Sequence, residues 1–436
     1  MNFLRTQIDV RFVALIRILA GIWFFVDVVS MLVSGYVKEA YVSSKLNLSF
    51  YGFEWLQALP GIGMYILFVL LAFVSVAIII GYRPKLFLTL FIIAFTYVFL
   101  IDVVYTLNKF YLFLLIAGLL LSSDQTTCWT YPNFRKCNEQ YAAYWNVFIF
   151  QALLCIIYFY SGIAKINHDW LYHAEPLHSF FQNRSYLRAL GKEGIETMSY
   201  MFSFAGITFD LSIAFILINK KTRFWGQLAQ ATFHTLNFSI LHIGSLSIFM
   251  ALFTFFLFPT DWLKRKMKLR EPVEATTTFE WNGKVILAFI ILAAQLIVPH
   301  RHYVSGHNVN WTEKGHRFSW RLMSRTKGGS RSNFTVVDNE SGERWNINPV
   351  NYLTGRQYRK MSAESDLLLF FGHYLEKEWN AKGYKDVSVY VNSKTRLNHR
   401  RPSAIISPEI DLTKVSRTFL VDKISDSMAP CHIHDK

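Results

Sequence analysis

The sequence has little charge for its length. Only 17% of its 436 residues are charged, whereas soluble domains average about 25%. With 52% hydrophobic residues and a mean hydropathy of +0.24, the chain lacks the polar residues that a water-soluble protein of this length needs to cover its core. These deficits exclude an ordinary soluble enzyme and indicate a membrane protein.

Motifs of several common enzyme classes are also missing. There is no Gly-x-Ser-x-Gly elbow, no Gly-rich phosphate loop and no His-Glu-x-x-His pair, so hydrolase, ATPase and zinc-protease functions have no local support. His168, His173 and His178 recur every five residues and do not share one helical face. The sequence predicts no metal site.

The chain has only four cysteines, too few for a dense disulfide framework, and none forms a Cys-x-x-Cys pair. Cys128 and Cys137 fall in a loop that we expect in the cytoplasm, where thiols stay reduced. Cys155 lies in an apolar segment, and Cys431 stands in a short Cys-His-Ile-His sequence near the end of the chain. We therefore expect no structural disulfide.

Long apolar runs are abundant. A helix needs about 20 apolar residues to cross the hydrocarbon core of a bilayer. The clearest candidates are residues 12–35, 61–81, 86–105, 145–164 and 283–298. Shorter or more polar candidates are residues 110–121, 201–218, 224–240 and 244–258. The sequence therefore predicts a polytopic α-helical membrane protein with eight or nine spans.

The net charge is +15, and many of the basic residues lie in short clusters between the apolar segments. If the N-terminus is cytoplasmic, every short basic cluster falls in a cytoplasmic loop, as the positive-inside rule requires. The clusters are Arg5 and Arg11; Arg83 and Lys85; Arg135 and Lys136; Lys220, Lys221 and Arg223; and five residues between 264 and 270. We interpret this charge as a topology signal and expect no nucleic-acid partner. The first apolar segment is long enough to span the bilayer, so we interpret it as a retained membrane helix rather than a signal peptide.

The composition becomes polar and charged after residue 298. Residues 299–436 are enough for one further domain, and with nine spans this domain lies outside the cytoplasm. Residues 333–338 and 343–347 flank Asn-Glu-Ser-Gly and predict a hairpin, 362–379 predict an amphipathic helix, and 386–392 alternate like a strand. The sequence thus predicts a membrane domain at 1–298 and an extracytoplasmic α+β domain at 299–436.

A few ionisable groups lie within or beside the predicted spans, where each costs a few kcal/mol. They are Arg17, Asp27, Asp102, Lys165, Asp210 and His234. Arg17 and Asp27 share one helix and could each pair with another span. His234 and Asn237 could line a polar pocket or join neighbouring helices.

Lys165 is the most informative of these groups. It ends the fifth span on the exterior side, in an aromatic setting, with Ser161 and Gly162 one turn earlier. Loss of solvation there would favour the neutral amine, which can act as a base. The structural alternative is a lysine whose ammonium reaches the membrane interface.

Residues 158–170, Tyr-Phe-Tyr-Ser-Gly-Ile-Ala-Lys-Ile-Asn-His-Asp-Trp, resemble a pattern of the vitamin K-dependent gamma-carboxylase family, whose membrane part is the horizontally transferred transmembrane (HTTM) domain. Lys165 falls on the lysine that serves this family as catalytic base. The similarity extends to residues 97–102, 108, 111–112, 233–237, 258–259, the His302 segment, 310–312, 318–323 and 408–411. Together these motifs cover nearly the whole chain.

The chain departs from the family pattern at two places. It has Asn108-Lys109 where the family usually has Asn-His, so a permanent cation replaces a histidine associated with the quinone chemistry. It also ends well short of the large animal enzymes, which carry additional exterior sequence.

The resemblance implies an integral membrane carboxylase of the carbon–carbon lyase class. Such an enzyme converts glutamate side chains of a protein or peptide to gamma-carboxyglutamate while it oxidises reduced vitamin K to the epoxide, with O2 and CO2 as co-substrates and no metal. Lys165 would be the base, and Asn108 and Lys109 would be polar groups of the quinone pocket. His234 and His302 would orient quinone or substrate.

Other interpretations stay open. The protein could catalyse quinone epoxidation without carboxylation, to which Lys109 points, or it could be a non-catalytic membrane protein that binds quinone or lipid. The partners in any case are membrane lipid and quinone. We expect a multi-pass protein with a cytoplasmic N-terminus, in a bacterial inner membrane rather than the endoplasmic reticulum.

Overall fold

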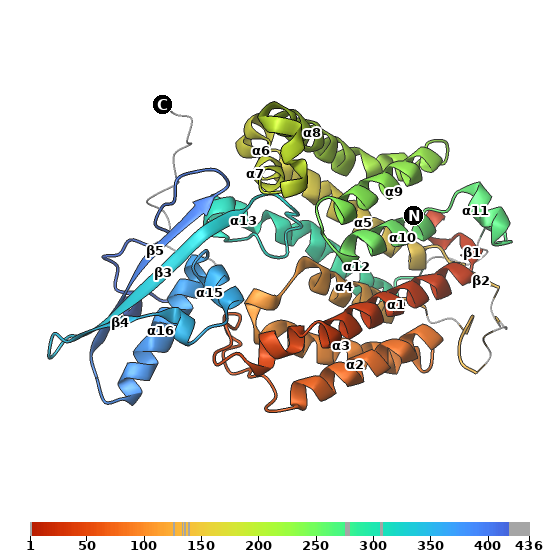
Figure 1. Ribbon diagram of the computed structural model, residues 1–436. Helices are drawn as coiled ribbons and strands as arrows, with labels where there is room; N and C mark the ends of the chain where they lie inside the picture. Colours follow the sequence, from red (N-terminus) through yellow and green to blue (C-terminus); the bar gives the residue numbers. More distant parts are fainter. Residues whose placement is uncertain are drawn as a thin grey trace.

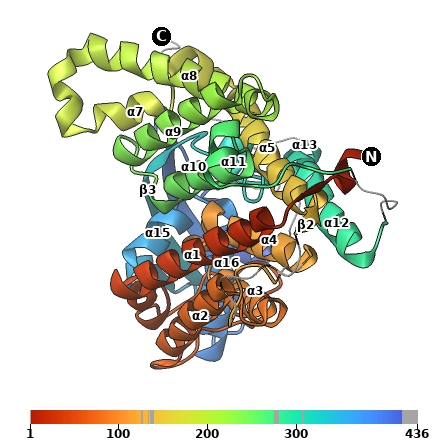
Figure 2. The same ribbon diagram turned by 90° about the vertical axis from the view of Figure 1, so that its right-hand side faces the viewer.

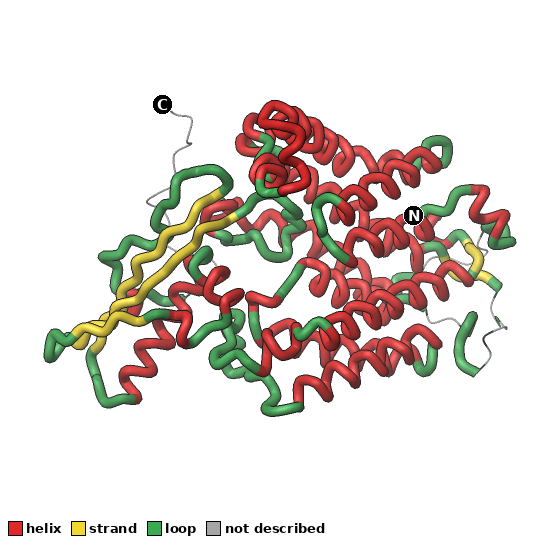
Figure 3. The backbone as a smooth tube through the Cα atoms, viewed as in Figure 1, coloured by secondary structure: helices red, strands yellow, loops and turns green. Residues whose placement is uncertain are grey.

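A bundle of long helices and a smaller sheet-containing domain make up the computed structural model, which describes residues 2–124, 127–132, 134, 137, 140–274, 280–305 and 308–417. Figure 1 shows the three-stranded sheet at one end of the bundle and the N-terminus near the other. The tube view separates a helical part from a part that holds the long strands (Figure 3). The predicted fold class, a polytopic helical membrane protein with an α+β domain, is confirmed.

Nine helices of the bundle coincide with the nine predicted apolar segments. They are α1 (Arg11–Val33), α2 (Gly63–Ile80), α3 (Pro84–Ile101), α4 (Asn108–Ser122), α5 (Trp145–Lys165), α8 (Gly191–Ile218), α9 (Arg223–Ser239), α10 (Ser245–Leu257) and α12 (Gly283–Ile297). Among the described residues, six helices are long and apolar enough to cross a membrane, and α4 and α10 are shorter apolar helices. Helix α9 is more polar because Gln227, Gln230 and His234 lie on it.

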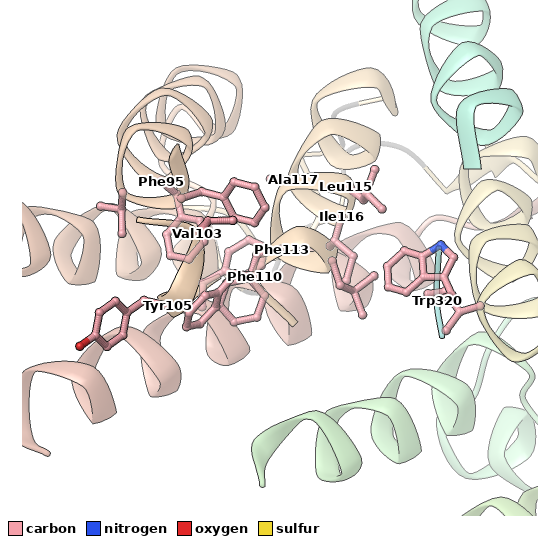
Figure 4. Close-up of a cluster of buried hydrophobic side chains, with 14 of the residues drawn as sticks. Phe95, Val103, Tyr105, Phe110, Phe113, Leu115, Ile116, Ala117 and Trp320 are labelled. Atoms are coloured by element: carbon pink, nitrogen blue, oxygen red, sulfur yellow. The ribbon is translucent and has the colours of Figure 1, made fainter. Parts of the chain in front are cut away.

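The bundle has two groups of helices. Viewed along the bundle, α2 and α3 lie on one side and α8 and α9 on the other, with α1, α4, α5 and α10 between them (Figure 2). Helix α1 packs on α2, α5 packs on α8, and α9 packs on α10. Aromatic side chains fill the interior: the Phe110 and Phe113 rings of α4 lie 5.5 Å from the Phe95 ring of α3 (Figure 4).

Short elements connect the long helices. They are α6 (His168–His173), α7 (Leu177–Gln182), α11 (Asp261–Lys266), α13 (Arg301–Ser305), α14 (Val309–Thr312), and the antiparallel strands β1 (Gln7–Asp9) and β2 (Tyr141–Ala143). The basic turn between α8 and α9 and the basic helix α11 lie at the end of the bundle opposite the sheet (Figure 1). Arg135 and Lys136 lie outside the described residues. The described basic clusters therefore gather at one end.

The C-terminal domain contains the predicted hairpin, helix and strand. Strands β3 (Lys327–Asp338), β4 (Arg344–Ile347) and β5 (Val387–Leu397) form an antiparallel sheet in the order β4-β3-β5. Alternate residues of β3 and β5 are buried, as expected of strands with one face on a core. Helix α16 (Ser365–Ala381) covers that face, with the Phe371 ring 4.9 Å from the Phe334 ring, and α15 (Gly355–Met361) joins it to the bundle.

Three buried charges of the bundle have partners in other segments. Arg17 donates hydrogen bonds of 2.7 and 2.6 Å to the main-chain oxygens of Ile78 and Ile79, where a cation offsets the negative C-terminal end of α2. Asp27 pairs with Lys109 of α4. The carboxylate of Asp102 accepts a 2.6 Å hydrogen bond from Gln357 of the C-terminal domain.

The expectation that the protein has no disulfide is wrong. Cys128 and Cys137 are bonded, with 4.0 Å between their Cα atoms. Cys128 packs against Val10 and Ala14 at the start of α1. The compartment expected for this loop says nothing of how close the two side chains come. Cys155 is free, and the Cys431 segment lies outside the described residues.

Candidate functional site

A cavity of about 360 Å³ lies between the two groups of helices. Its walls come from α4, α5, α8, α9 and α10 and from residues 320–323, which precede the sheet of the C-terminal domain. Most of the lining is apolar. Four of the five predicted site residues line it: Asn108, Lys109, Lys165 and His234. The fold thus brings together residues that are up to 126 positions apart in the chain, as between Asn108 and His234.

Lys165 ends α5 inside this cavity with only 5% of its surface exposed. Its ammonium donates hydrogen bonds to the Ser161 hydroxyl at 2.7 Å and to the Asp210 carboxylate at 2.6 Å. The Ser161 hydroxyl donates to the same Asp210 oxygen at 2.7 Å, and the Trp170 ring lies 5.4 Å from the ammonium. Lys165 is therefore buried and its ammonium is hydrogen-bonded inside the protein, unlike that of a lysine that reaches the membrane interface.

Asp210, for which the sequence indicated no specific role, is the acidic partner of Lys165. It lies on α8 and is 2% exposed, so an unpaired carboxylate there would be costly. Its approach to Lys165 depends on Gly162 of α5: a Cβ at this position would stand 2.6 Å from Leu211 Cδ2. Gly162 thus lets α8 approach α5 closely, in addition to leaving room for the aliphatic part of the Lys165 side chain.

A second polar group faces the cavity from α9. His234 Nε2 lies 2.9 Å from the Tyr158 hydroxyl, and the Gln230 amide donates to that hydroxyl and, at 3.1 Å, to Thr254. Because the Gln230 amide donates to the Tyr158 oxygen, the Tyr158 hydroxyl can donate its own hydrogen to His234 Nε2. When Nε2 accepts this hydrogen bond, the N–H of a neutral imidazole is on Nδ1. His234 Nδ1 is buried and has no hydrogen-bond partner among the described residues, so it is a donor available to a ligand oxygen.

Lys109 is held by groups that the sequence did not connect with it. Its ammonium lies 3.2 Å from the Asp27 carboxylate of α1 and 3.4 Å from the Ser245 hydroxyl of α10. That hydroxyl also donates to Asp27 at 3.0 Å. The Lys109 cation is therefore compensated by a carboxylate within the bundle.

The C-terminal domain closes the cavity. Trp320, Leu322 and Met323 line it, and the Trp320 indole donates a 3.2 Å hydrogen bond to Gln295 of α12. Phe318, Trp320 and Met323 all have positive φ angles of 54–61°, which is uncommon for residues other than glycine. Such backbone persists only where its surroundings impose it, and it gathers at functional sites.

A second interdomain contact lies just beyond Lys165. Asp169 accepts hydrogen bonds of 2.7 Å from Asn398 and 2.5 Å from Arg400, both in the turn after β5. The next residue, Trp170, lies beside Lys165. The C-terminal domain therefore fixes the segment that carries one wall of the site.

His302 is not brought to the cavity. It lies in α13, where its Nδ1 is 2.8 Å from the main-chain oxygen of Pro299 and its ring is 4.1 Å from that of Tyr303. Among the described residues there is no group of three or more His, Cys, Asp or Glu side chains that could hold a metal ion.

Two family models match the chain. Residues 6–262 match the HTTM domain, and residues 281–423 match the vitamin K-dependent gamma-carboxylase lumenal domain. The chain therefore belongs to the HTTM family, and the two matches in this order identify it as a member of the vitamin K-dependent gamma-carboxylase family. The protein is a multi-pass membrane protein with an extracytoplasmic domain and a carboxylase-like function. No solved structure matches it significantly.

The second match begins at residue 281, so it includes α12 as well as the sheet. The boundary predicted after residue 298 stays a prediction.

Gly162→Ala should weaken the contact between α5 and α8. The added methyl group would overlap Leu211, and overpacking of this kind costs about 1–3 kcal/mol. We expect a lower thermal midpoint in detergent and a loss of whatever activity depends on the Lys165–Asp210 pair. Gly118→Ala is the matched control, since its Cβ would meet Ile291 at an ordinary 3.4 Å. Equal midpoints for the two variants would contradict this account of Gly162.

Proposed function

We propose that this protein carboxylates glutamate side chains of a protein or peptide, coupled to oxidation of reduced vitamin K to its epoxide. One observation carries the proposal: the buried Lys165 lies in a cavity whose walls come both from the bundle and from the C-terminal domain. In this proposal the lipid-soluble quinone enters from the side of the bundle, and the glutamyl peptide enters from the side of the C-terminal domain. The cavity meets the requirements of both.

The cavity lining fits the quinone. Its walls are apolar, as for a ring with an isoprenoid tail, and His234 Nδ1 is a buried donor without a partner among the described residues. Asn108 and Lys109 supply further polar groups to the same cavity. When bound, reduced vitamin K supplies, with O2, the strong base that removes the glutamate γ-proton before CO2 adds.

In this proposal Lys165 is the catalytic residue and takes the proton from a hydroxyl of reduced vitamin K, the hydroquinone. A base must offer a neutral amine, so the ammonium proton of Lys165 passes to the Asp210 carboxylate, 2.6 Å away, as the hydroxyl enters. Asp210 and Ser161 hold the amine in position, and both act through Lys165. The aromatic and aliphatic walls exclude water, which would otherwise quench a strong base.

Epoxidation without carboxylation is the second candidate. It is favoured by one observation, the Lys109–Asp27 pair, because an ammonium ion occupies the position of the family histidine. A quinone- or lipid-binding protein without catalysis is the third. The products of the assay below separate the three.

The test uses purified protein in bilayers with reduced vitamin K, labelled bicarbonate and a glutamate-rich peptide. We expect both epoxide and fixed label from the wild type, and a loss of about 100-fold or more in both for Lys165→Ala, because a positioned base contributes that much. Lys284→Ala is the control, since Lys284 pairs with Asp124 outside the cavity. Epoxide without label would support the second candidate, and neither product would support the third.

We also propose that the N-terminus is cytoplasmic and that the membrane is a bacterial inner membrane. The support is the basic end of the bundle, which lies opposite the C-terminal domain (Figure 1). A cysteine at Glu340, in the exposed turn after β3, should react with an impermeant maleimide on intact spheroplasts. A cysteine at Lys221, between α8 and α9, should react only after lysis, and the reverse pattern would contradict the proposed topology.

A further inference from the structure

A chain of buried hydrogen bonds leads from α10 to the wall of the Lys165 cavity. Its members are Thr254 of α10, Gln230 and His234 of α9, and Tyr158 of α5. All four side chains belong to residues that are 0 to 7% exposed. Tyr158 and His234 line the cavity, whereas Gln230 and Thr254 do not. The chemistry proposed for the cavity gives the last two residues no role.

The first hydrogen bond sets the direction of the chain. The Thr254 hydroxyl donates its only hydrogen to the main-chain oxygen of Met250 at 2.8 Å, so its oxygen accepts from Gln230 Nε2, 3.1 Å away. The amide nitrogen of Gln230 therefore faces both Thr254 and Tyr158. The reverse orientation would put the amide hydrogens where Oε1 has no partner among the described residues, leaving two N–H groups unpaired instead of one oxygen.

The next hydrogen bonds carry this direction to the cavity. Because the Gln230 amide donates to the Tyr158 oxygen, the Tyr158 hydroxyl donates to His234 Nε2, 2.9 Å away. The single N–H of a neutral imidazole is then on Nδ1, which is buried and has no partner in the described part of the chain. The chain thus ends in one N–H donor on a residue that lines the cavity.

This donor and Lys165 belong to the two ends of one helix face. Tyr158, Ser161 and Lys165 of α5 are spaced i, i+3 and i+7, and all three line the cavity. Seven residues of helix advance by about 10 Å, which suits a para-quinone ring with a hydrogen bond at each of its two oxygens. The Lys165 amine and the His234 N–H can therefore meet oxygens at opposite ends of one ring.

We propose that Gln230 and Thr254 are positioning residues that hold His234 as a neutral Nδ1–H donor to one ring oxygen of the quinone, while the other ring oxygen lies at Lys165. This inference rests on the proposed function, from which it takes its ligand. Gln230 and Thr254 act through Tyr158 and His234 and touch no reacting atom. The fixed donor favours a ring with an oxygen at that end, which reduced and oxidised vitamin K both have, over an aromatic hydrocarbon of the same shape.

The test detects the position of the imidazole proton. The protein is labelled at its histidines with the heavy nitrogen isotope and studied in bilayers by solid-state NMR, which separates protonated from unprotonated ring nitrogens. The signals of His234 are identified by their loss in His234→Gln. In the wild type we expect the proton on Nδ1, and we expect oxidised vitamin K to shift the Nδ1 signal.

Thr254→Val removes the acceptor that orients Gln230, so the amide can turn over and accept from the Tyr158 hydroxyl. His234 Nε2 then donates to the Tyr158 oxygen, and we expect the imidazole proton to move from Nδ1 to Nε2 in part or in full. The affinity for oxidised vitamin K, measured by quenching of the tryptophans that line the cavity, should fall about three- to tenfold, the effect of one hydrogen bond. Thr254→Ser keeps a hydroxyl and should behave as the wild type does.

Two substitutions on α9 are matched controls. Gln227 also donates to α10, at the main-chain oxygens of Phe255 and Phe258, but it does not line the cavity. Gln227→Leu therefore loosens the same pair of helices and should leave the proton on His234 Nδ1. Thr232→Val makes the Thr-to-Val exchange at an exposed position and should do the same.

Several outcomes would overturn the inference. They are a wild-type His234 with its proton on Nε2 or on both nitrogens, an Nδ1 signal that vitamin K does not shift, an unchanged proton position in Thr254→Val, and the same change in Gln227→Leu as in Thr254→Val. If Thr254→Val does not fold, the wild type still decides through its proton position and its response to vitamin K.

Lys165→Ala separates this inference from the proposed function. It should keep the proton on His234 Nδ1 and bind oxidised vitamin K, while it loses the epoxide and the fixed label. A wild type that has the expected proton position and vitamin K response but forms neither product would uphold the positioning role and refute the reaction.

Discussion

The buried ion pair between Lys165 and Asp210 is the constraint on which the site depends. Two charges removed from water inside a bundle are tolerated only with close geometry and further hydrogen bonds, and loss of one partner costs about 3–5 kcal/mol. The Ser161 hydroxyl supplies the further hydrogen bonds, and Gly162 lets α8 come close enough for a 2.6 Å contact. In the proposed reaction, Asp210 also accepts the proton of Lys165.

The cavity around this pair is built from two domains, which explains why the fold combines them. The bundle contributes Lys165, Asp210 and His234, and the C-terminal domain contributes Trp320 and the strained segment that contains it. Hydrogen bonds from Asn398 and Arg400 to Asp169 and from Gln357 to Asp102 tie the domains together on either side. The resulting cavity is mostly apolar, and its walls come from both domains.

Much of the fold follows from the sequence, because apolar length and periodicity are local properties. The nine helical segments, the hairpin, α16 and β5 were all predictable, and the resemblance indicated four of the residues that line the cavity. The contacts between distant segments were not. Asp210 is 45 residues from Lys165, and Asp27 and Ser245 approach Lys109 from two other helices. Helix length does not say which helices adjoin, and the compartment expected for Cys128 did not say how close Cys137 lies.

The most direct test of the role of the pair is the dependence of epoxide formation on pH in the wild type and in Asp210→Asn. The amide keeps a hydrogen bond to Lys165 but removes the negative charge that stabilises the ammonium ion. If Lys165 is the base, the rising limb of the rate profile should move to lower pH in the variant. An unchanged midpoint with only a lower rate would contradict the assignment, because the ionisation of the catalytic group would then be independent of Asp210.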